Sequence, residues 1–219
     1  MSVRDLRVVD DLVDAAVELF LETTPRTIAL SGGSTPKPVY ERLAQTPYPW
    51  RDVDAFFGDE RCVPSDHPDS NFRMANEALL AKVPARSHPM SECDPDAYRA
   101  ELQDVFGSGV PLFDLVFLGL GDDGHTASLF PGDPALDVTG EPVVRVEHPG
   151  MPPEHPRLTL TLPVLNAAKL SLFLVAGRSK REPLRRLMEG DQRVPAARVR
   201  SDAVIVLADR EAAGDPAGD

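Results

Sequence analysis

The segment from Asp114 to Pro131 constrains the fold of this chain more than any other. Its sequence is DLVFLGLGDDGHTASLFP, so a short apolar run passes directly into a glycine-rich loop with two acids and a histidine. An uninterrupted apolar run is typical of a strand that is covered on both faces, as in a parallel sheet. Glycines after such a strand let the backbone turn sharply and leave room for a ligand. The segment therefore predicts an α/β protein with a site at the carboxyl end of this strand.

His125 is the candidate acid–base residue of this loop, because an imidazole can take up or release a proton near neutral pH. Asp123 stands two residues earlier and can orient or polarise the ring. The loop also satisfies the dinucleotide pattern G-x-G-x-x-G, but Asp122 and Asp123 would repel a pyrophosphate. Taken alone, the loop is also compatible with a structural turn that carries an incidental histidine.

A second glycine-rich loop follows a predicted strand at residues 26–31. It consists of Gly32, Gly33, Ser34 and Thr35. Ser34 or Thr35 is expected to cap a helix that has Pro36 at its first position. Exposed amide groups at such a turn favour an anion, although an ordinary capped turn is an alternative. The loop lacks the lysine of a Walker motif, so nucleoside triphosphate binding is not indicated.

A charged group follows the predicted strand at residues 54–58. Asp59, Glu60 and Arg61 stand together there. Burying such charges at the end of a strand costs free energy unless they contact a ligand or pair with one another. The cluster therefore indicates either part of a binding site or an internal ion-pair network.

Four blocks of this sequence resemble the 6-phosphogluconolactonase family, and they occur in the same order as in that family. The blocks are SGGSTP at 31–36, GDERCVP at 58–64 with SNFRM at 70–74, GLGDDGHTASLFP at 119–131, and RLTLTLP at 157–163 followed by 172–180. The resemblance implies a Rossmann-like fold shared with glucosamine-6-phosphate deaminase and ribose-5-phosphate isomerase. It also implies hydrolysis of 6-phospho-D-glucono-1,5-lactone in the oxidative pentose phosphate pathway.

The chemistry implied by the resemblance assigns roles to particular residues. His125 is expected to activate water as the general base, and Asp123 to orient its ring. The expected substrate- and phosphate-binding residues are Gly32, Gly33, Ser34, Thr35, Asp59, Arg61, Arg157 and Lys180. Lactone hydrolysis by this route needs neither a metal nor another cofactor, and none is expected.

Two alternatives stay open at the level of sequence. In the related deaminases the corresponding loop resembles Asp-Gly-His with a glutamate five positions after the histidine, whereas this chain has Phe130 there. A phosphosugar-binding module without turnover would need the phosphate loop but not the pair formed by Asp123 and His125.

Length and composition allow one domain, or one domain with a small lobe. We expect a single lactonase domain over residues 1–210, with a loop-rich excursion at 132–156 and a disordered tail at 211–219. The sheet is expected to be mostly parallel with helices on both faces. Expected strands are 3–9, 26–31, 54–58, 114–119, 143–146, 157–162, 170–176 and 203–208; expected helices are 12–21, 36–45, 70–81, 94–106, 163–168 and 179–189.

Charge and hydropathy narrow the possible partners. The net charge of −12 argues against nucleic acid or an anionic membrane, and no apolar run approaches a membrane span. No leader is apparent, so a cytoplasmic location is expected, with a small sugar phosphate lactone as the partner and no obligate protein partner.

Cysteine and histidine usage gives no sign of a disulfide framework or a metal cluster. Cys62 and Cys93 are expected to be reduced thiols. The other four histidines fall in proline-rich polar loops and are expected to be surface residues. They are His67, His88, His148 and His155.

Overall fold

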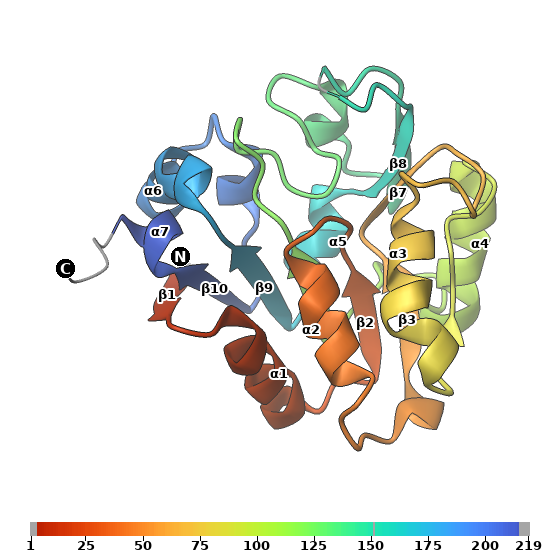
Figure 1. Ribbon diagram of the computed structural model, residues 1–219. Helices are drawn as coiled ribbons and strands as arrows, with labels where there is room; N and C mark the ends of the chain where they lie inside the picture. The colour runs from red at the N-terminus through yellow and green to blue at the C-terminus, as the bar shows by residue number, and fades with distance from the viewer. Residues whose placement is uncertain (1–3, 151, 215–219) are drawn as a thin grey trace.

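A seven-stranded sheet forms the centre of the computed structural model, which describes residues 4–150 and 152–214 (Figure 1). Its strand order is β1-β10-β9-β6-β2-β3-β5, and every pairing is parallel. The strands are β1 (Arg4–Val9), β2 (Thr27–Leu30), β3 (Asp54–Phe57), β5 (Arg86–Ser87), β6 (Leu115–Leu118), β9 (Leu170–Val175) and β10 (Ala203–Asp209). The predicted α/β class with a mostly parallel sheet is confirmed.

The apolar runs form strands because helices cover the sheet. Every residue of β6 and β9 is buried, as expected for strands covered on both faces. In Figure 1, α1, α2 and α3 lie in front of the sheet and α5 lies behind it. The helices are α1 (Leu12–Thr23), α2 (Pro36–Leu43), α3 (Asn71–Ala78), α4 (Pro95–Phe106), α5 (Leu162–Ala167), α6 (Arg181–Glu189) and α7 (Arg210–Ala213).

Local signals in the sequence set the helix boundaries. The side chain of Asp11 accepts hydrogen bonds from the first backbone N–H groups of α1. Asp94 does the same for α4, where Pro95 occupies the first turn. A hydroxyl or carboxyl acceptor at these positions satisfies amides that the helix itself leaves free.

A second, antiparallel sheet has the order β4-β8-β7 and lies beyond the carboxyl end of β3. Its strands are β4 (Asp59–Arg61), β7 (Val143–Val146) and β8 (Arg157–Leu160). The expectation that segment 157–162 completes the parallel sheet is therefore wrong. Gly58 joins the two sheets, because its N–H donates to Leu30 O at 2.9 Å while its own carbonyl accepts from Leu160 N at 2.8 Å.

The expected disordered tail is wrong for its first residues, which belong to α7. The Asp209 carboxylate accepts a hydrogen bond from Ala212 N at 2.7 Å, and Gly214 ends the helix in a left-handed conformation. The burial of Ala212 anchors this short helix. Residues 215–219 lie outside the described part of the chain.

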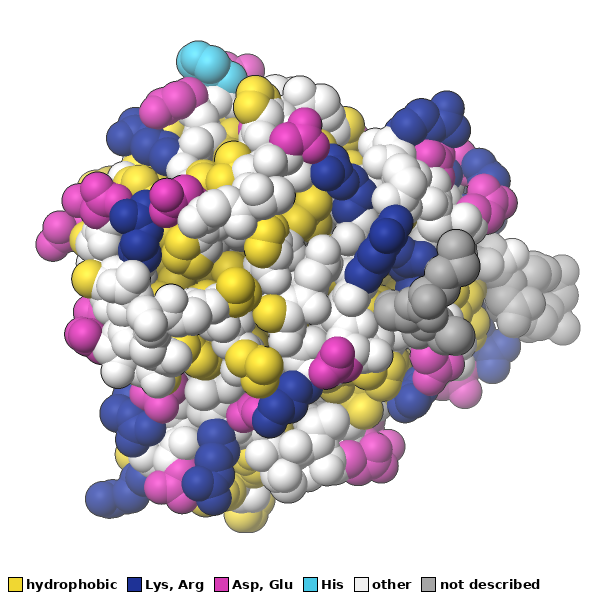
Figure 2. All heavy atoms as spheres, turned by 180° about the vertical axis from the view of Figure 1, so that it is seen from behind, with side chains coloured by type: hydrophobic (Ala, Val, Ile, Leu, Met, Phe, Trp, Pro, Cys, Tyr) yellow, Lys and Arg dark blue, Asp and Glu magenta, His cyan; other side chains and the backbone are white. Residues whose placement is uncertain are grey.

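The surface carries charges of both signs. On the face turned away in Figure 1, acidic and basic side chains are interspersed around an area of hydrophobic and uncharged groups (Figure 2). The net charge of −12 is thus not gathered into one acidic patch on this face. Among the described residues, no helix has the length and apolar character needed to cross a membrane.

Candidate functional site

The strand order of the parallel sheet places the two glycine-rich loops next to each other. From β2 the chain proceeds to β3 and β5 on one side, and it returns to form β6 on the other side of β2. The strand order reverses between β2 and β6. Where the order of an open α/β sheet reverses, the loops after the two neighbouring strands diverge and leave a crevice at the carboxyl ends of these strands, and ligands bind there. The loop at 31–35 follows β2, and the loop at 119–131 follows β6.

His125 and Asp123 form a hydrogen-bonded pair in the second loop. Nδ1 of His125 lies 2.6 Å from Oδ1 of Asp123, and the same oxygen accepts a hydrogen bond from His125 N at 3.0 Å. Burial alone would raise the pKa of Asp123, but the hydrogen bonds from His125 outweigh this effect and hold it below its ordinary value. An ionised Asp123 accepts the Nδ1 proton, and the neutral ring then carries its lone pair on Nε2.

Gly121 provides the space in which the His125 ring lies. A Cβ atom at this position would be 2.0 Å from Nδ1 of His125 and 2.8 Å from Oδ1 of Asp123. Gly121 N also donates to His125 O at 2.9 Å, which closes the loop. The glycine is therefore required by close packing against the catalytic candidate.

The loop at 31–35 exposes backbone amides to the crevice. Thr35 is the N-cap residue of α2 and Pro36 its first residue, as predicted, but no side chain forms the expected capping hydrogen bond. Among the described residues, the N–H groups from Gly32 to Thr35 have no hydrogen-bond acceptor. Gly33 has φ +107, a conformation that favours glycine. Free amides at a helix N-terminus form a site suited to an anion.

Arg61 and Arg157 are directly opposed in the antiparallel pairing of β4 with β8. Directly opposed residues project from the same face, and two like charges in that position are unfavourable without an anion. Burial lowers the pKa of the Arg157 guanidinium, and the positive charge of Arg61 lowers it further. Arg61 Nη1 donates to Asp69 O at 2.6 Å, and Arg157 Nη2 donates to Pro153 O at 3.0 Å.

The neighbouring acids of β4 have separate environments. The Glu60 carboxylate is buried and accepts hydrogen bonds from Arg61 N, Asn71 N, Phe72 N and Ser70 Oγ at 2.6–3.0 Å. It therefore holds the start of α3 and is not among the residues that line the cleft. Asp59 accepts a 2.6 Å hydrogen bond from Ser128 Oγ, which ties the histidine loop to the small sheet.

Lys180 forms an ion pair with Asp122 across the site. Ser179 Oγ donates to the same carboxylate oxygen at 3.1 Å. The hydrogen bond from Lys180 is the main reason why the pKa of Asp122 lies below its ordinary value. Lys180 thus reaches the crevice from the short 3-10 turn after β9, with its charge already compensated.

These groups surround a cleft of about 350 Å³. Nine of the ten residues predicted from sequence line it: Gly32, Gly33, Ser34, Thr35, Asp59, Arg61, His125, Arg157 and Lys180. The tenth, Asp123, is not among the lining residues and contacts His125 instead. Their chemical roles stay predictions.

The cleft lining also includes residues that the sequence analysis did not assign to the site, among them the polar residues Ser31 and Asn71. Asn71 Nδ2 donates to Asp59 O at 2.9 Å. Ser31 Oγ and the Nε atoms of Arg61 and Arg157 are buried and have no hydrogen-bond partner in the described part of the chain. Buried polar groups normally have a partner, so these atoms are available to a polar ligand. Asn71 lies in the SNFRM block at 70–74 that resembles the family, and this block was the usable signal.

Phe130 is buried against both the histidine and an arginine. Its ring centroid lies 4.7 Å from that of His125, and the Arg157 guanidinium carbon lies 5.7 Å from the Phe130 centroid. The position that carries a glutamate in the resembled deaminases is therefore an apolar contact. It can supply no proton to a substrate.

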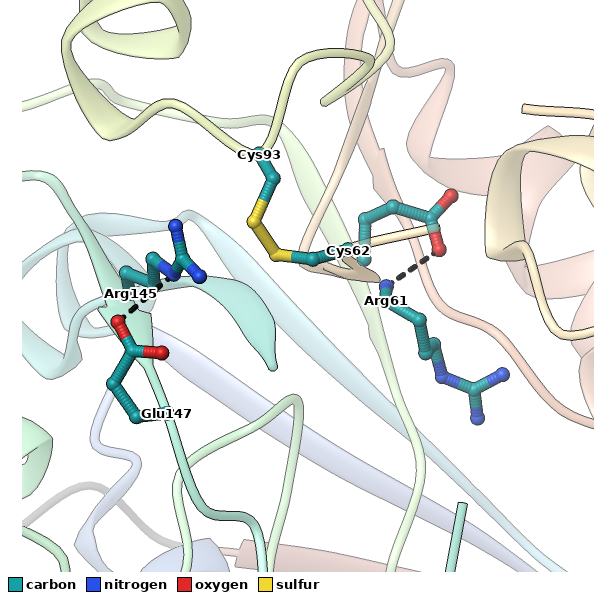
Figure 3. Close-up of a disulfide and its surroundings, with 6 residues drawn as sticks. Arg61, Cys62, Cys93, Arg145 and Glu147 are labelled. Carbon is teal, nitrogen blue, oxygen red and sulfur yellow. Dashed lines mark hydrogen bonds and ion pairs between the residues drawn. A yellow bond between two sulfur atoms is a disulfide. The ribbon is translucent and has the colours of Figure 1, made fainter. Parts of the chain in front are cut away.

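Cys62 and Cys93 form a disulfide, so the expectation of two reduced thiols is wrong (Figure 3). Their Cα atoms are 5.1 Å apart although 31 residues separate them in sequence. Cys62 follows Arg61 directly, and in Figure 3 the Arg61 side chain points away from the disulfide. Only the tertiary fold brings the loop that carries Cys93 beside β4, and two isolated cysteines in a sequence do not reveal such proximity.

Comparisons with known proteins agree on one family. A family model described as glucosamine-6-phosphate isomerases/6-phosphogluconolactonase matches residues 5–207. A 6-phosphogluconolactonase of Synechocystis is 46% identical over 202 residues, which cover 85% of this chain and 82% of that protein.

Two solved structures are similar to this chain over nearly its whole length. The 6-phosphogluconolactonase of Trypanosoma brucei superposes with a TM-score of 0.87 at 29% identity, covering 99% of this chain and 100% of the other. A monomeric glucosamine-6-phosphate deaminase gives a TM-score of 0.79 at 25% identity, with coverages of 96% and 99%. The fold predicted from the sequence is thus shared with both enzyme types.

Proposed function

Because this chain belongs to the glucosamine-6-phosphate isomerase/6-phosphogluconolactonase family, we propose that it hydrolyses 6-phospho-D-glucono-1,5-lactone to 6-phospho-D-gluconate. This reaction is the second step of the oxidative pentose phosphate pathway and makes the protein a carboxylic ester hydrolase. The observation that carries the proposal is the His125–Asp123 pair, which lies in the loop at the carboxyl end of β6. The cleft beside it is also lined by three cationic side chains.

In the proposed mechanism, Nε2 of His125 removes a proton from water, and the water oxygen bonds to the lactone carbonyl carbon. The carbonyl becomes an oxyanion. When its double bond re-forms, the bond from that carbon to the ring oxygen breaks, and the proton held by His125 passes to the ring oxygen. Asp123 keeps the ring oriented and stabilises its transient positive charge. Positioned general-base catalysis contributes about 10²–10⁴-fold to such a reaction.

We further propose that the phosphate binds between the amides from Gly32 to Thr35 and the cations Arg61, Arg157 and Lys180. Guanidinium groups form paired hydrogen bonds with phosphate oxygens, and a dianion relieves the repulsion between two opposed arginines. Lys180 exchanges Asp122 for a phosphate oxygen when the substrate enters. An acidic protein can therefore hold a dianionic substrate through a local reversal of charge.

The deciding experiment follows the loss of 6-phosphogluconolactone by the purified protein, with the spontaneous hydrolysis subtracted. Release of ammonia from glucosamine 6-phosphate is measured in parallel. Because Phe130 supplies no carboxylate, we expect lactone hydrolysis without deamination. Robust deamination with negligible lactonase activity would overturn the assignment, and binding of both phosphosugars without turnover would indicate a non-catalytic module.

We also propose a cytoplasmic location for this enzyme, with the small sugar phosphate as its partner and without nucleic acid, membrane or an obligate protein partner. Cytoplasmic thiols tend to be kept reduced, so the disulfide between Cys62 and Cys93 is the feature that puts this location to the test. Cell fractionation combined with thiol alkylation measures both at once. Recovery of the protein outside the cytoplasmic fraction would contradict the proposed location.

A further inference from the structure

Three side chains converge outside the proposed catalytic machinery and are not among the residues that line the cleft. His67 and Asp69 lie in the loop between β4 and α3, and His155 lies just before β8. Oδ2 of Asp69 is 3.0 Å from Nε2 of His155 and 3.8 Å from Nδ1 of His67. The donor atoms of all three residues lie within 4.8 Å of one another. Two loops that are 86 residues apart in sequence thus meet through one carboxylate.

Among the described residues, the basic side chains in direct contact with this carboxylate are the two histidines of the cluster. No lysine or arginine in the described ranges lies within 4 Å of it. Arg61, which is nearby, donates to the backbone carbonyl of Asp69 instead. The three side chains are 34–38% exposed, so an ion can reach them and keep water in its remaining coordination positions.

The donor set matches the preferences of a particular class of ion. Two imidazoles and a carboxylate suit zinc and neighbouring transition metals, whereas calcium and magnesium prefer oxygen ligands alone. Tetrahedral ligands about 2.0–2.2 Å from zinc are about 3.3–3.6 Å apart. The observed 3.0 Å and 3.8 Å need small shifts, and the two imidazole nitrogens, which lie within 4.8 Å of each other, must come closer together. Nδ1 of His67 accepts a hydrogen bond from Asp69 N at 3.1 Å, so this nitrogen carries a lone pair that a metal could use in place of the amide.

We propose that His67, Asp69 and His155 bind a divalent transition-metal ion, with Zn²⁺ as the best match. The ion replaces the Asp69 N–H as the partner of His67 and bridges the two loops. Asp69 accepts a hydrogen bond from Arg61 through its carbonyl, and His155 stands two residues before Arg157. The ion therefore holds the backbone that positions both arginines and takes no part in the step at His125.

Tag-free protein, dialysed against a chelator, is titrated with CoCl₂ by visible absorption and with ZnCl₂ by calorimetry. We expect one equivalent of metal per chain and a rise in Tm on binding. His67→Gln, Asp69→Asn and His155→Gln should each weaken binding by at least about tenfold, because each removes a ligand. His148→Gln is the matched control, since this exposed histidine lies outside the cluster, and it should bind as the parent does.

Absence of a stoichiometric cobalt spectrum in the parent protein would overturn the proposal. Undiminished affinity in the two histidine variants would do the same, because the metal would then be bound elsewhere. Circular dichroism monitors the fold of every variant. Should Asp69→Asn unfold, the two histidine variants still decide the question, because their partly exposed side chains can be replaced with little disturbance of packing.

Discussion

Arg61 and Arg157 stand directly opposite each other in the pairing of β4 with β8, so two positive charges share one face of the small sheet beside the cleft. Two opposed cations favour a doubly charged ligand, because each can bind its own phosphate oxygens.

We expect Arg61→Ala and Arg157→Ala each to raise KM for 6-phosphogluconolactone roughly ten- to hundredfold, since a charge-assisted hydrogen bond contributes about 1.5–3 kcal/mol. Arg157→Lys is the matched variant, because lysine keeps the positive charge but lacks the planar guanidinium group that can form two hydrogen bonds with one phosphate. Steady-state kinetics on gluconolactone without phosphate provides the control and should change little. Equal losses on both substrates would assign these arginines to the fold or to the reacting centre.

Replacing His125 by Ala should lower kcat by about 10²–10⁴-fold and leave KM nearly unchanged, because a general base acts mainly in the transition state. Asp123→Asn should cause a smaller loss, since the ring keeps its place but can adopt the wrong tautomer. Single-turnover and steady-state rates measure both effects. A His125→Ala variant with nearly parental kcat would remove this residue from the mechanism.

Gly121→Ala tests whether catalysis depends on the space beside the histidine. A Cβ atom there would be 2.2 Å from Cε1 of His125, so the ring must move away from Asp123. We expect kcat to fall while phosphate binding, followed with inorganic phosphate as a competitive inhibitor, is retained. Gly140→Ala is the control, because a Cβ atom at that position meets nothing within 4 Å. Parental kcat in Gly121→Ala would show that the ring position is not critical.

The disulfide between Cys62 and Cys93 should stabilise the protein by about 3–4 kcal/mol, from the loop entropy of a 31-residue separation. Replacing both cysteines by serine should therefore lower Tm. The reductant dithiothreitol should lower the Tm of the parent to a similar degree and leave the double variant unchanged. A parent whose Tm does not respond to reduction, with loss of the bond verified by thiol counting, would contradict this expectation.

Asp54 links stability to pH through its contact with Arg86. Hydrogen bonds from Arg86 Nε and Nη2, at 2.7 Å and 2.6 Å, lower the pKa of Asp54 from its ordinary value of 3.8. A lowered folded-state pKa gives stability that is present above the ordinary value and is lost as pH falls through the folded value. The Tm of Asp54→Asn should therefore lie below that of the parent at pH 7, and the gap should narrow as the pH falls below 3.8 toward the lowered folded-state pKa. A gap that persists or widens in acid would refute this linkage.

Features that depend on neighbouring residues could be predicted from the sequence. The pairing of Asp123 with His125 spans two residues, and the strand before it was marked by an uninterrupted apolar run. The order of strands and helices followed from the same kind of pattern. The resemblance to a known family added Arg157 to the expected binding residues. Arg157 is 96 residues from Arg61, which it opposes in the small sheet, and no local sequence pattern links the two.

Features that arise from tertiary contacts could not be predicted in this way. The residues of β8 have strand-forming character, but this does not tell which sheet they join, and they pair with β4 rather than with the parallel strands. The same reason applies to the bond between Cys62 and Cys93. His88 was expected at the surface, yet it stacks on Phe56 with ring centroids 4.2 Å apart and contacts two carboxylates.

Gly32 and Asn71 constrain each other's replacement in descendants of this sequence. A Cβ atom on residue 32 would be 1.8 Å from Oδ1 of Asn71, so a larger residue at 32 requires the Asn71 amide to move or a smaller side chain to replace it. A smaller residue at 71 in turn gives up the hydrogen bond that Asn71 donates to Asp59 O. Neither single step is neutral, so the two positions are coupled in evolution, and lineages that keep the cleft are expected to retain both residues or to exchange both together.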